Sequence, residues 1–392
     1  MHFQLENTLK MKPFIYLIGL LFACQFSNAQ VEYESIDSQK LGESRDIKIQ
    51  LPRGYEENID KNYPLIIVFD GDYMFELVTG NVDYYSYWED MPEAIVVGVN
   101  QVDKRNDDNT YSEQNSLPID SGAAFFEFIG MELIPYLEKS LRIENFRVAI
   151  GHGATANFVN YYLLKPVPLF QAYISISPDL APDMLTYIPE RIQNIENKVF
   201  YYLATSNEDV KSIKVKTEAL NTSITAIENT NFLYNFKTFD GPSHYALPAN
   251  AIPEALESIF FVYQPISKKE YSETILKLES SPIEYLLEKY QTIEDLFGIE
   301  KQILINDFKA IAAAIKKTEK YEYFEELGKI ARKQYPESML GNYYIARFYE
   351  ETNEPKKAMK TYQSAYPLEE IAGLTKDFML EKADEIKADF GY

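Results

Sequence analysis

The chain alternates short apolar runs with longer stretches in which apolar residues recur at helical spacing, clearest at 123–134 and 157–164. Residues 45–51 alternate polar and apolar side chains, which predicts a half-exposed antiparallel strand at the edge of a sheet. The apolar runs suit central parallel strands buried on both faces; they are 65–69, 94–99, 147–150, 172–176, 199–203 and 232–236. This order predicts an α/β fold over about 30–264, with a mostly parallel sheet and helices on both faces.

The pattern changes at about residue 264, where Pro265 ends the last helix and strand signals stop. The chain from 267 to 392 is helical in its spacing, with 353–355 in a turn. Six of its residues have the spacing of a tetratricopeptide repeat: Ile345, Ala346, Tyr349, Ala358, Tyr362 and Ala365.

An earlier, degenerate repeat matches at Ala331 and Pro336 but fits poorly at Phe324 and Gly328. Because such arrays usually need three repeats to be stable alone, we expect 267–392 to pack on the first domain or on a protein partner. A generic helical bundle fits the same pattern. In either case the region would serve in docking and not in chemistry.

The N-terminus has the pattern of an export signal. Two lysines precede a short apolar run at 14–24, and small residues at 27 and 29 suit cleavage after Ala29. We therefore expect a signal peptide at 1–29, a mature chain from Gln30 and a periplasmic or extracellular location. The run is too short to span a bilayer. Its Asn-Ala-Gln ending resembles exported proteins of the Bacteroidetes.

A competing interpretation makes residues 21–24 a lipobox and Cys24 a lipidated cysteine. The bulky Phe22 and the downstream cleavage site favour the signal peptide. Removal of 1–29 would leave no cysteine, which excludes disulfides, thiol nucleophiles and cysteine-based zinc sites. Only His152 and His244 would remain, too few for a three-histidine metal site. We predict no cofactor and no metal.

The net charge of the chain limits the classes of molecule that it can bind. The chain has 60 acidic and 38 basic residues, a net charge of −22. Nucleic acids and anionic membrane surfaces both need a basic face, so both are excluded as partners. We expect a small molecule or another protein.

Candidate chemistry lies where strands end, because open sheets of this type bind ligands beyond the carboxyl ends of their strands. A Gly-His-Gly turn follows 147–150 and precedes a helix, the setting of the G-x-S-x-G nucleophile elbow, with Gly153 at the nucleophile position. Glu208 and Asp209 follow a later strand, and His244 lies in a turn-rich loop after the last one. Elbow, acid, histidine is the chain order of α/β-hydrolases.

In these features the chain resembles the putative-esterase family of α/β-hydrolases, which includes esterase D and the enterobactin-esterase-like proteins. The resemblance covers about 31–262. It rests on five stretches in the family's order: 51–71, 128–136, 146–152, 169–178 and 244–260.

The resemblance implies an α/β-hydrolase fold and hydrolysis of carboxylic esters. It implies that Glu208, or Asp209, orients His244 as a general base. The corresponding oxyanion donors would be the N–H of Ala154 and an N–H near Gly71 and Asp72.

The sequence also departs from the family pattern, at positions that bear on catalysis. Gly153 stands where the family has its nucleophilic serine, and glycine has no side chain to attack a carbonyl. Thr155 would point elsewhere from a helix start, and Ser175 and Ser177 look structural. The basic-acidic stretch that the family carries after its fourth strand is altered at 100–110. Loss of such a nucleophile costs on the order of 10⁶ in turnover.

The candidate residues also have structural explanations. His244 fits a loop histidine held by local hydrogen bonds as well as it fits a retained base. Glu208 and Asp209 fit an acidic pair at a helix N-terminus, and His152 fits packing beneath the elbow. The aromatic cluster at 84–88 fits an amphipathic helix on the sheet better than a cap over a pocket.

Three functional hypotheses follow. The first is an exported pseudo-hydrolase that binds an ester-like ligand or a partner without serine catalysis. The second is an active ester hydrolase with a rearranged site, for example water activated by His244. The third is an assembly protein that acts through its helical tail, residues 267–392.

Overall fold

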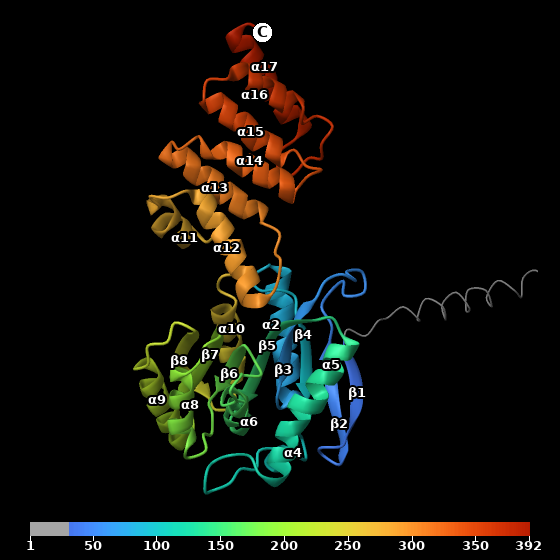
Figure 1. Cartoon of the computed structure of the whole chain (residues 1–392), viewed down its shortest axis with the longest axis vertical. Helices are drawn as coiled ribbons and strands as arrows, with labels where there is room; N and C mark the ends of the chain where they lie inside the picture. The colour runs from blue at the N-terminus through green and yellow to red at the C-terminus, as the bar shows by residue number, and fades with distance from the viewer. Residues whose placement is uncertain (1–30) are drawn as a thin grey trace, which may run out of the picture.

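The computed structural model describes residues 31–392, so the predicted signal peptide and Cys24 lie outside the described residues. Its centre is an eight-stranded sheet in the order β1-β2-β4-β3-β5-β6-β7-β8 (Figure 1). The pairs β1–β2 and β2–β4 are antiparallel, and the other neighbours are parallel. The strands are β1 Val31–Ser38, β2 Glu43–Gln50, β3 Tyr63–Val68, β4 Ile95–Val99, β5 Ile143–His152, β6 Ala172–Ile176, β7 Val199–Glu208 and β8 Phe232–Ser243. The predicted mostly parallel α/β sheet is confirmed.

The predicted edge strand at 45–51 is antiparallel as expected, but its edge position was wrong. It forms β2, and β1 pairs along its outer side. β1 is polar, and its Tyr33 is 72% exposed. An edge strand that faces solvent needs few apolar side chains, so its sequence pattern was too weak to detect.

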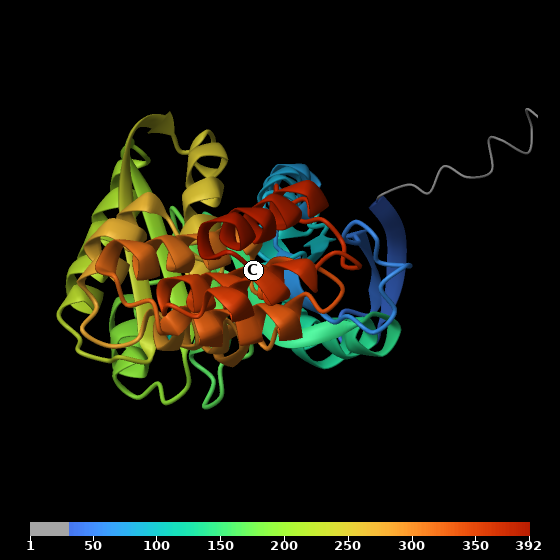
Figure 2. The ribbon, with the colours of Figure 1, turned by 90° about the horizontal axis from the view of Figure 1, so that it is seen from above.

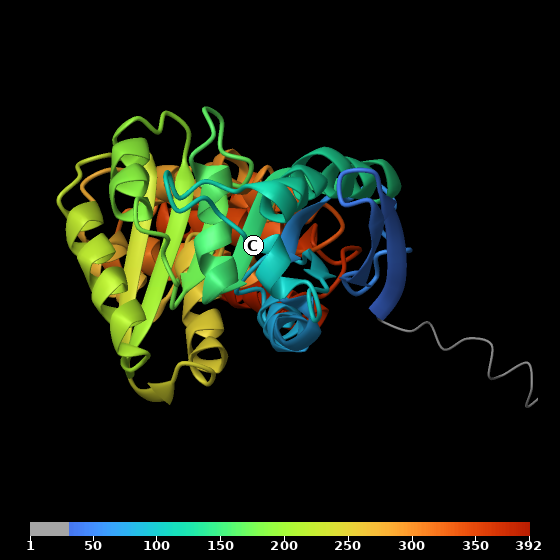
Figure 3. The same cartoon turned by 90° about the horizontal axis from the view of Figure 1, so that it is seen from below.

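The two faces of the sheet bury separate apolar layers. Ile66 and Val68 of β3 belong to one layer, and Leu65 and Ile67 to the other. Because neighbouring residues of a strand point to opposite faces, both faces of β3 are buried, which explains its continuous apolar run. The first face is covered by α2 (Gly71–Tyr87) and α10 (Leu247–Ile259); the second is covered by α4 (Asp120–Phe128), α5 (Ile134–Ser140), α8 (Met184–Gln193) and α9 (Lys211–Thr225) (Figure 3).

Several helices and strands begin or end at residues other than those predicted. The helix expected at 123–134 is α4, a π-helical turn at Ile129–Leu133 and α5. The helix expected at 157–164 starts earlier, as α6 (Ala154–Phe158) followed by α7 (Asn160–Leu163). Strands β7 and β8 continue past their apolar runs to Glu208 and Ser243. The periodicity of apolar residues shows which part of a helix or strand is buried. It cannot locate the ends of an element when its terminal residues are polar.

The aromatic cluster lies at the carboxyl end of α2, in agreement with the helical interpretation. Its rings, however, do not all pack on the sheet: Tyr84 and Tyr87 are each 62% exposed and Trp88 is 59% exposed. None of the three lines the cavity described below.

The chain beyond α10 is helical, as predicted. Its helices are α11 Lys268–Glu273, α12 Pro282–Phe297, α13 Ile305–Thr318, α14 Tyr323–Gln334, α15 Leu340–Glu351, α16 Pro355–Gln363 and α17 Lys376–Phe390, with a 3₁₀ turn at Ile275–Lys277. α15 and α16 form the helix pair expected around the turn at 353–355. Ala346, Ala358 and Tyr362 are fully buried there. Assignment to the tetratricopeptide class stays a prediction.

The helical tail packs on the amino ends of the parallel strands, one of the two arrangements expected (Figures 1 and 2). Phe297 of α12 lies 5.0 Å, ring centre to ring centre, from Phe146 near the start of β5. The carboxyl ends of the strands are at the opposite edge. Between α10 and α11 the connection ends at Ser267, whose side chain caps α11. Within 31–392, no helix has both the length and the apolar character needed to cross a bilayer.

Candidate active site

The turn after β5 has the backbone geometry of a nucleophile elbow. Gly153 has φ 63° and ψ −119° and connects β5 directly to α6. Gly151 lets strand and helix approach closely, because a Cβ at this position would lie 2.5 Å from the carbonyl oxygen of Thr155. The positive φ of residue 153 is a conformation that glycine adopts more easily than any other residue.

Asp209, and not Glu208, contacts the histidine. Asp209 Oδ1 lies 2.8 Å from His244 Nδ1, and the aspartate side chain is fully buried. Glu208 is the exposed last residue of β7. Neither residue belongs to the first turn of α9, which begins at Lys211, but Asp209 accepts from the N–H of Val210, the N-cap residue of that helix. Glu208 ends β7, whereas Asp209 lies in the bend that follows, where its side chain reaches His244.

Two hydroxyl groups hold the other carboxylate oxygen of Asp209. Ser177 Oγ donates to Oδ2 at 2.6 Å and Thr205 Oγ1 donates to it at 2.9 Å. Burial would raise the pKa of Asp209, but hydrogen bonds from His244, Ser177, Thr205 and the Val210 N–H lower it to about 2. Ser177 thus belongs to the site, which its position directly after β6 could have suggested. Ser175 donates elsewhere, to the carbonyl of Ala156.

These contacts determine the tautomer of His244. A carboxylate only accepts hydrogen bonds, so Nδ1 carries the proton that points at Asp209. In the neutral imidazole, Nε2 then has a free lone pair. This nitrogen lies 3.6 Å from the position that a Cβ of residue 153 would occupy. The histidine is therefore oriented as a general base toward an absent nucleophile.

A second acidic centre adjoins the elbow. Asp70 follows β3, is 1% exposed and forms a two-pronged ion pair with Arg105, at 2.6 and 3.0 Å. Arg105 also donates to the carbonyl of His152, at 3.0 Å. Thr155 donates to Asp70 Oδ2 at 2.7 Å, which is where its hydroxyl points.

Sequence analysis missed Arg105, because it lies in a polar stretch without periodicity, in the short helix α3 (Arg105–Asp108). In the sequence, the only indication of a role for Arg105 was its positive charge within the segment 100–110. Its contacts identify it as the cation of the site.

His152 lies beside His244 and not beneath the elbow. The two ring centres are 4.5 Å apart, and both side chains line the cavity. Nε2 of His152 lies 3.1 Å from the carbonyl oxygen of His244, and Nδ1 lies 3.2 Å from the hydroxyl of Tyr73. A carbonyl only accepts, so Nε2 of His152 is the donor. The Tyr73 hydroxyl donates its single hydrogen to Asp70 Oδ2, at 3.0 Å.

Burial lowers the pKa of His152 to about 4, and repulsion from His244 acts in the same direction. An unfolded histidine titrates near 6.5, so the unfolded state takes up this proton first as the pH falls. We therefore predict that His152 removes about 3 kcal/mol of folding free energy between pH 6.5 and 4. The midpoint of urea unfolding across this range should depend less on pH in His152→Gln. An unchanged pH dependence in the variant would contradict the assignment.

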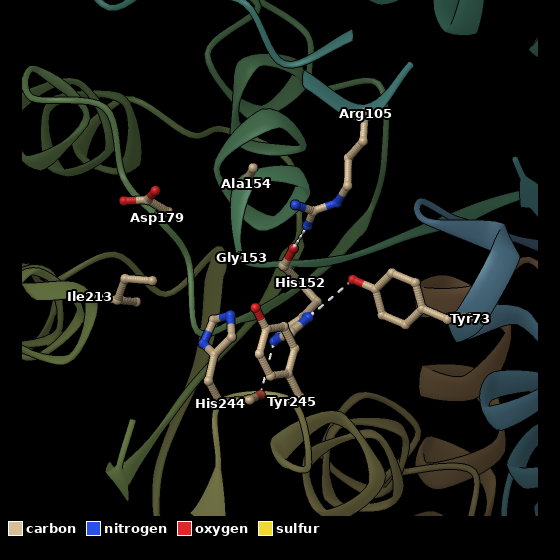
Figure 4. A pocket seen from close by; sticks show the side chains of 9 residues that line it. All are labelled: Tyr73, Arg105, His152, Gly153, Ala154, Asp179, Ile213, His244 and Tyr245. Atoms are coloured by element: carbon tan, nitrogen blue, oxygen red, sulfur yellow. Dashed lines mark hydrogen bonds between the residues drawn. The ribbon is translucent and has the colours of Figure 1, made fainter. Parts of the chain in front are cut away.

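A cavity of about 400 Å³ lies at these residues (Figure 4). Its lining includes Gly153 and Ala154 from the elbow, together with Arg105, His152 and His244. Ile213 and the rings of Tyr73 and Tyr245 add apolar surface.

The two expected oxyanion donors are placed differently. Ala154 lines the cavity, whereas Gly71 and Asp72 do not. Gly71 packs against the backbone of Gly98, and the carboxylate of Asp72 accepts from the N–H of Gln101. Within residues 31–392, no group of three His, Cys, Asp or Glu side chains is placed to hold a metal ion.

The fold and this arrangement define an α/β-hydrolase. Residues 38–233, half of the chain, match the family described as "Putative esterase". A search of curated proteins finds no match. An uncharacterised protein of Capnocytophaga ochracea, a Bacteroidetes species, is 32% identical, with a TM-score of 0.82 over 92% of this chain and 100% of the other. The chain belongs to this esterase family.

Two further solved structures share the fold. An IroE-like serine hydrolase from Shewanella oneidensis is 19% identical, with a TM-score of 0.59 over 76% of this chain and 98% of its own. The BES protein from Bacillus cereus is 21% identical, with a TM-score of 0.52 over 59% and 95%. At these identities the likeness concerns the fold alone.

Proposed function

We propose that this protein is an exported member of the esterase family that binds a small ester-like ligand without serine catalysis. One observation carries the proposal. The elbow backbone and the His244–Asp209 pair have the arrangement of a working hydrolase, but Gly153 provides no nucleophile. The family relationship supports an ester-like ligand.

Neither Ser177 nor Thr155 replaces the missing serine. Ser177 lies on the Nδ1 side of His244, is fully buried and donates to Asp209. Thr155 is fully buried, donates to Asp70 and accepts from the N–H of His152. Neither hydroxyl faces Nε2 of His244, the nitrogen that would accept a proton from a nucleophile.

The experiment is hydrolysis of p-nitrophenyl acetate by the mature protein, with labelling by a fluorophosphonate that reacts with activated serines. We expect no label and a rate no higher than that of His244→Asn. Asparagine places an amide donor near the position of Nδ1 and lacks Nε2. Turnover well above this variant would overturn the proposal and require water activated by His244.

Export is part of the proposal and is supported by the N-terminal pattern alone. A secreted or periplasmic product whose N-terminal residue is Gln30 would support cleavage after Ala29. A product that starts at Cys24 and carries lipid would favour the lipobox instead.

A further inference from the structure

The missing side chain of residue 153 leaves a definable space beside His244. A Cβ built at Gly153 would lie 3.5 Å from Arg105 Nη2 and 3.6 Å from His244 Nε2, with no nearer atom. These are ordinary van der Waals distances. A group of the size of a methyl or a hydroxyl therefore fits here, and we call this space, bounded by Gly153, Arg105 and His244, the notch.

The hydrogen-bonding groups around the notch are of two kinds. His244 Nε2 is an acceptor, because Nδ1 holds the proton that Asp209 binds. Arg105 Nη2 is a donor beside the notch, but it already serves Asp70 and the His152 carbonyl. The N–H of Ala154 is a second donor and has no acceptor among residues 31–392.

We propose that the ligand places a hydroxyl group in the notch, donating to His244 Nε2 and accepting from the Ala154 N–H. A hydroxyl both donates and accepts, whereas ether, ester and carboxylate oxygens only accept and would face the lone pair of Nε2. The ester-like ligand therefore carries a free hydroxyl group, with its carbon skeleton against Tyr73, Ile213 and Tyr245. The inference rests on the proposed function, because a serine at residue 153 would fill the notch itself.

Charge also favours a neutral alcohol over a carboxylate. Asp209 is ionised and contacts His244 directly, and Asp70 already takes up the charge of Arg105. Asp179, which lines the cavity, lies 3.9 Å from the ammonium group of Lys216. The charge of Lys216 is therefore already paired and is not available to a carboxylate ligand. A carboxylate would need an additional proton on His244 to bind beside these groups, whereas an alcohol needs none.

The test uses the mature protein and ¹⁹F NMR of two probes, 2,2,2-trifluoroethanol and its methyl ether. The two probes share the CF₃CH₂O group, and only the alcohol can donate. We expect the alcohol to bind about five to ten times more tightly than the ether, as one hydrogen bond provides. Gly153→Ala, whose methyl group occupies the notch, should remove this preference. Gly80→Ala is the matched control, because a Cβ at this exposed position of α2 meets nothing within 4 Å.

His244→Asn gives a second, independent variant should the positive φ of residue 153 strain the alanine. It removes Nε2, and we expect loss of the same preference. Equal binding of alcohol and ether, no detectable binding of the alcohol, or a preference that survives both variants would overturn the inference. None of these three results would contradict the absence of serine catalysis, because that part of the proposed function is tested by ester hydrolysis in the unmodified protein.

Discussion

Substituting Gly153 by serine is expected to produce strong ester hydrolysis. The backbone at residue 153 already has φ 63° and ψ −119° between β5 and α6. A Cβ there would lie 3.6 Å from His244 Nε2, so a serine hydroxyl comes within hydrogen-bond reach of the base. We expect p-nitrophenyl acetate hydrolysis to rise at least about 10³-fold over the parent, toward the roughly 10⁶ that such nucleophiles contribute. The variant should also react with a fluorophosphonate.

Two further substitutions in the Gly153→Ser background test which acid orients the histidine. Asp209→Asn should lower the gained activity by about 10³- to 10⁴-fold, because the amide favours the wrong tautomer of His244. Glu208→Gln changes a neighbouring, exposed carboxylate in the same way and should have little effect. A folded but inert Gly153→Ser protein, or equal effects of the two substitutions, would contradict this geometry.

Truncating Phe297 should cost about 3–5 kcal/mol of unfolding free energy, the range for a large aromatic side chain in a core. Phe297 is 1% exposed, and its ring lies 5.0, 6.0 and 5.2 Å from the rings of Phe146, Phe200 and Phe260. All three partners belong to the chain before residue 264. Phe297→Ala therefore leaves a cavity between the sheet and the helical tail, which circular dichroism in urea would detect.

Leu287→Ala is the matched control on the same helix, because Leu287 is 43% exposed and should change stability by no more than about 0.5 kcal/mol. The shape of the curve is informative as well. A shift confined to one of two separate transitions would mean that the tail and the sheet unfold independently, contrary to the shared core. The ester hydrolysis gained by Gly153→Ser should not depend on Phe297, which packs at the opposite edge of the sheet.

The candidate site was partly accessible from sequence because its residues follow strands. Gly153, His244 and an acidic pair could each be placed at a carboxyl end. The choice between Glu208 and Asp209 was not accessible, because β7 extends beyond its apolar run and one residue decides which side chain turns toward His244. Arg105 was missed for another reason: its role depends on Asp70, a residue 35 positions away in the chain.

The sequence by itself determined the α/β fold, the helical character of the tail and the absence of a serine at residue 153. These follow from local periodicity and residue identity, which are properties of the chain before it folds. Tertiary structure alone decided that Asp209 binds His244, that His152 lies beside it, and that Phe297 closes the core against the sheet. Each of these depends on the distance between residues far apart in sequence, which only the packed chain defines.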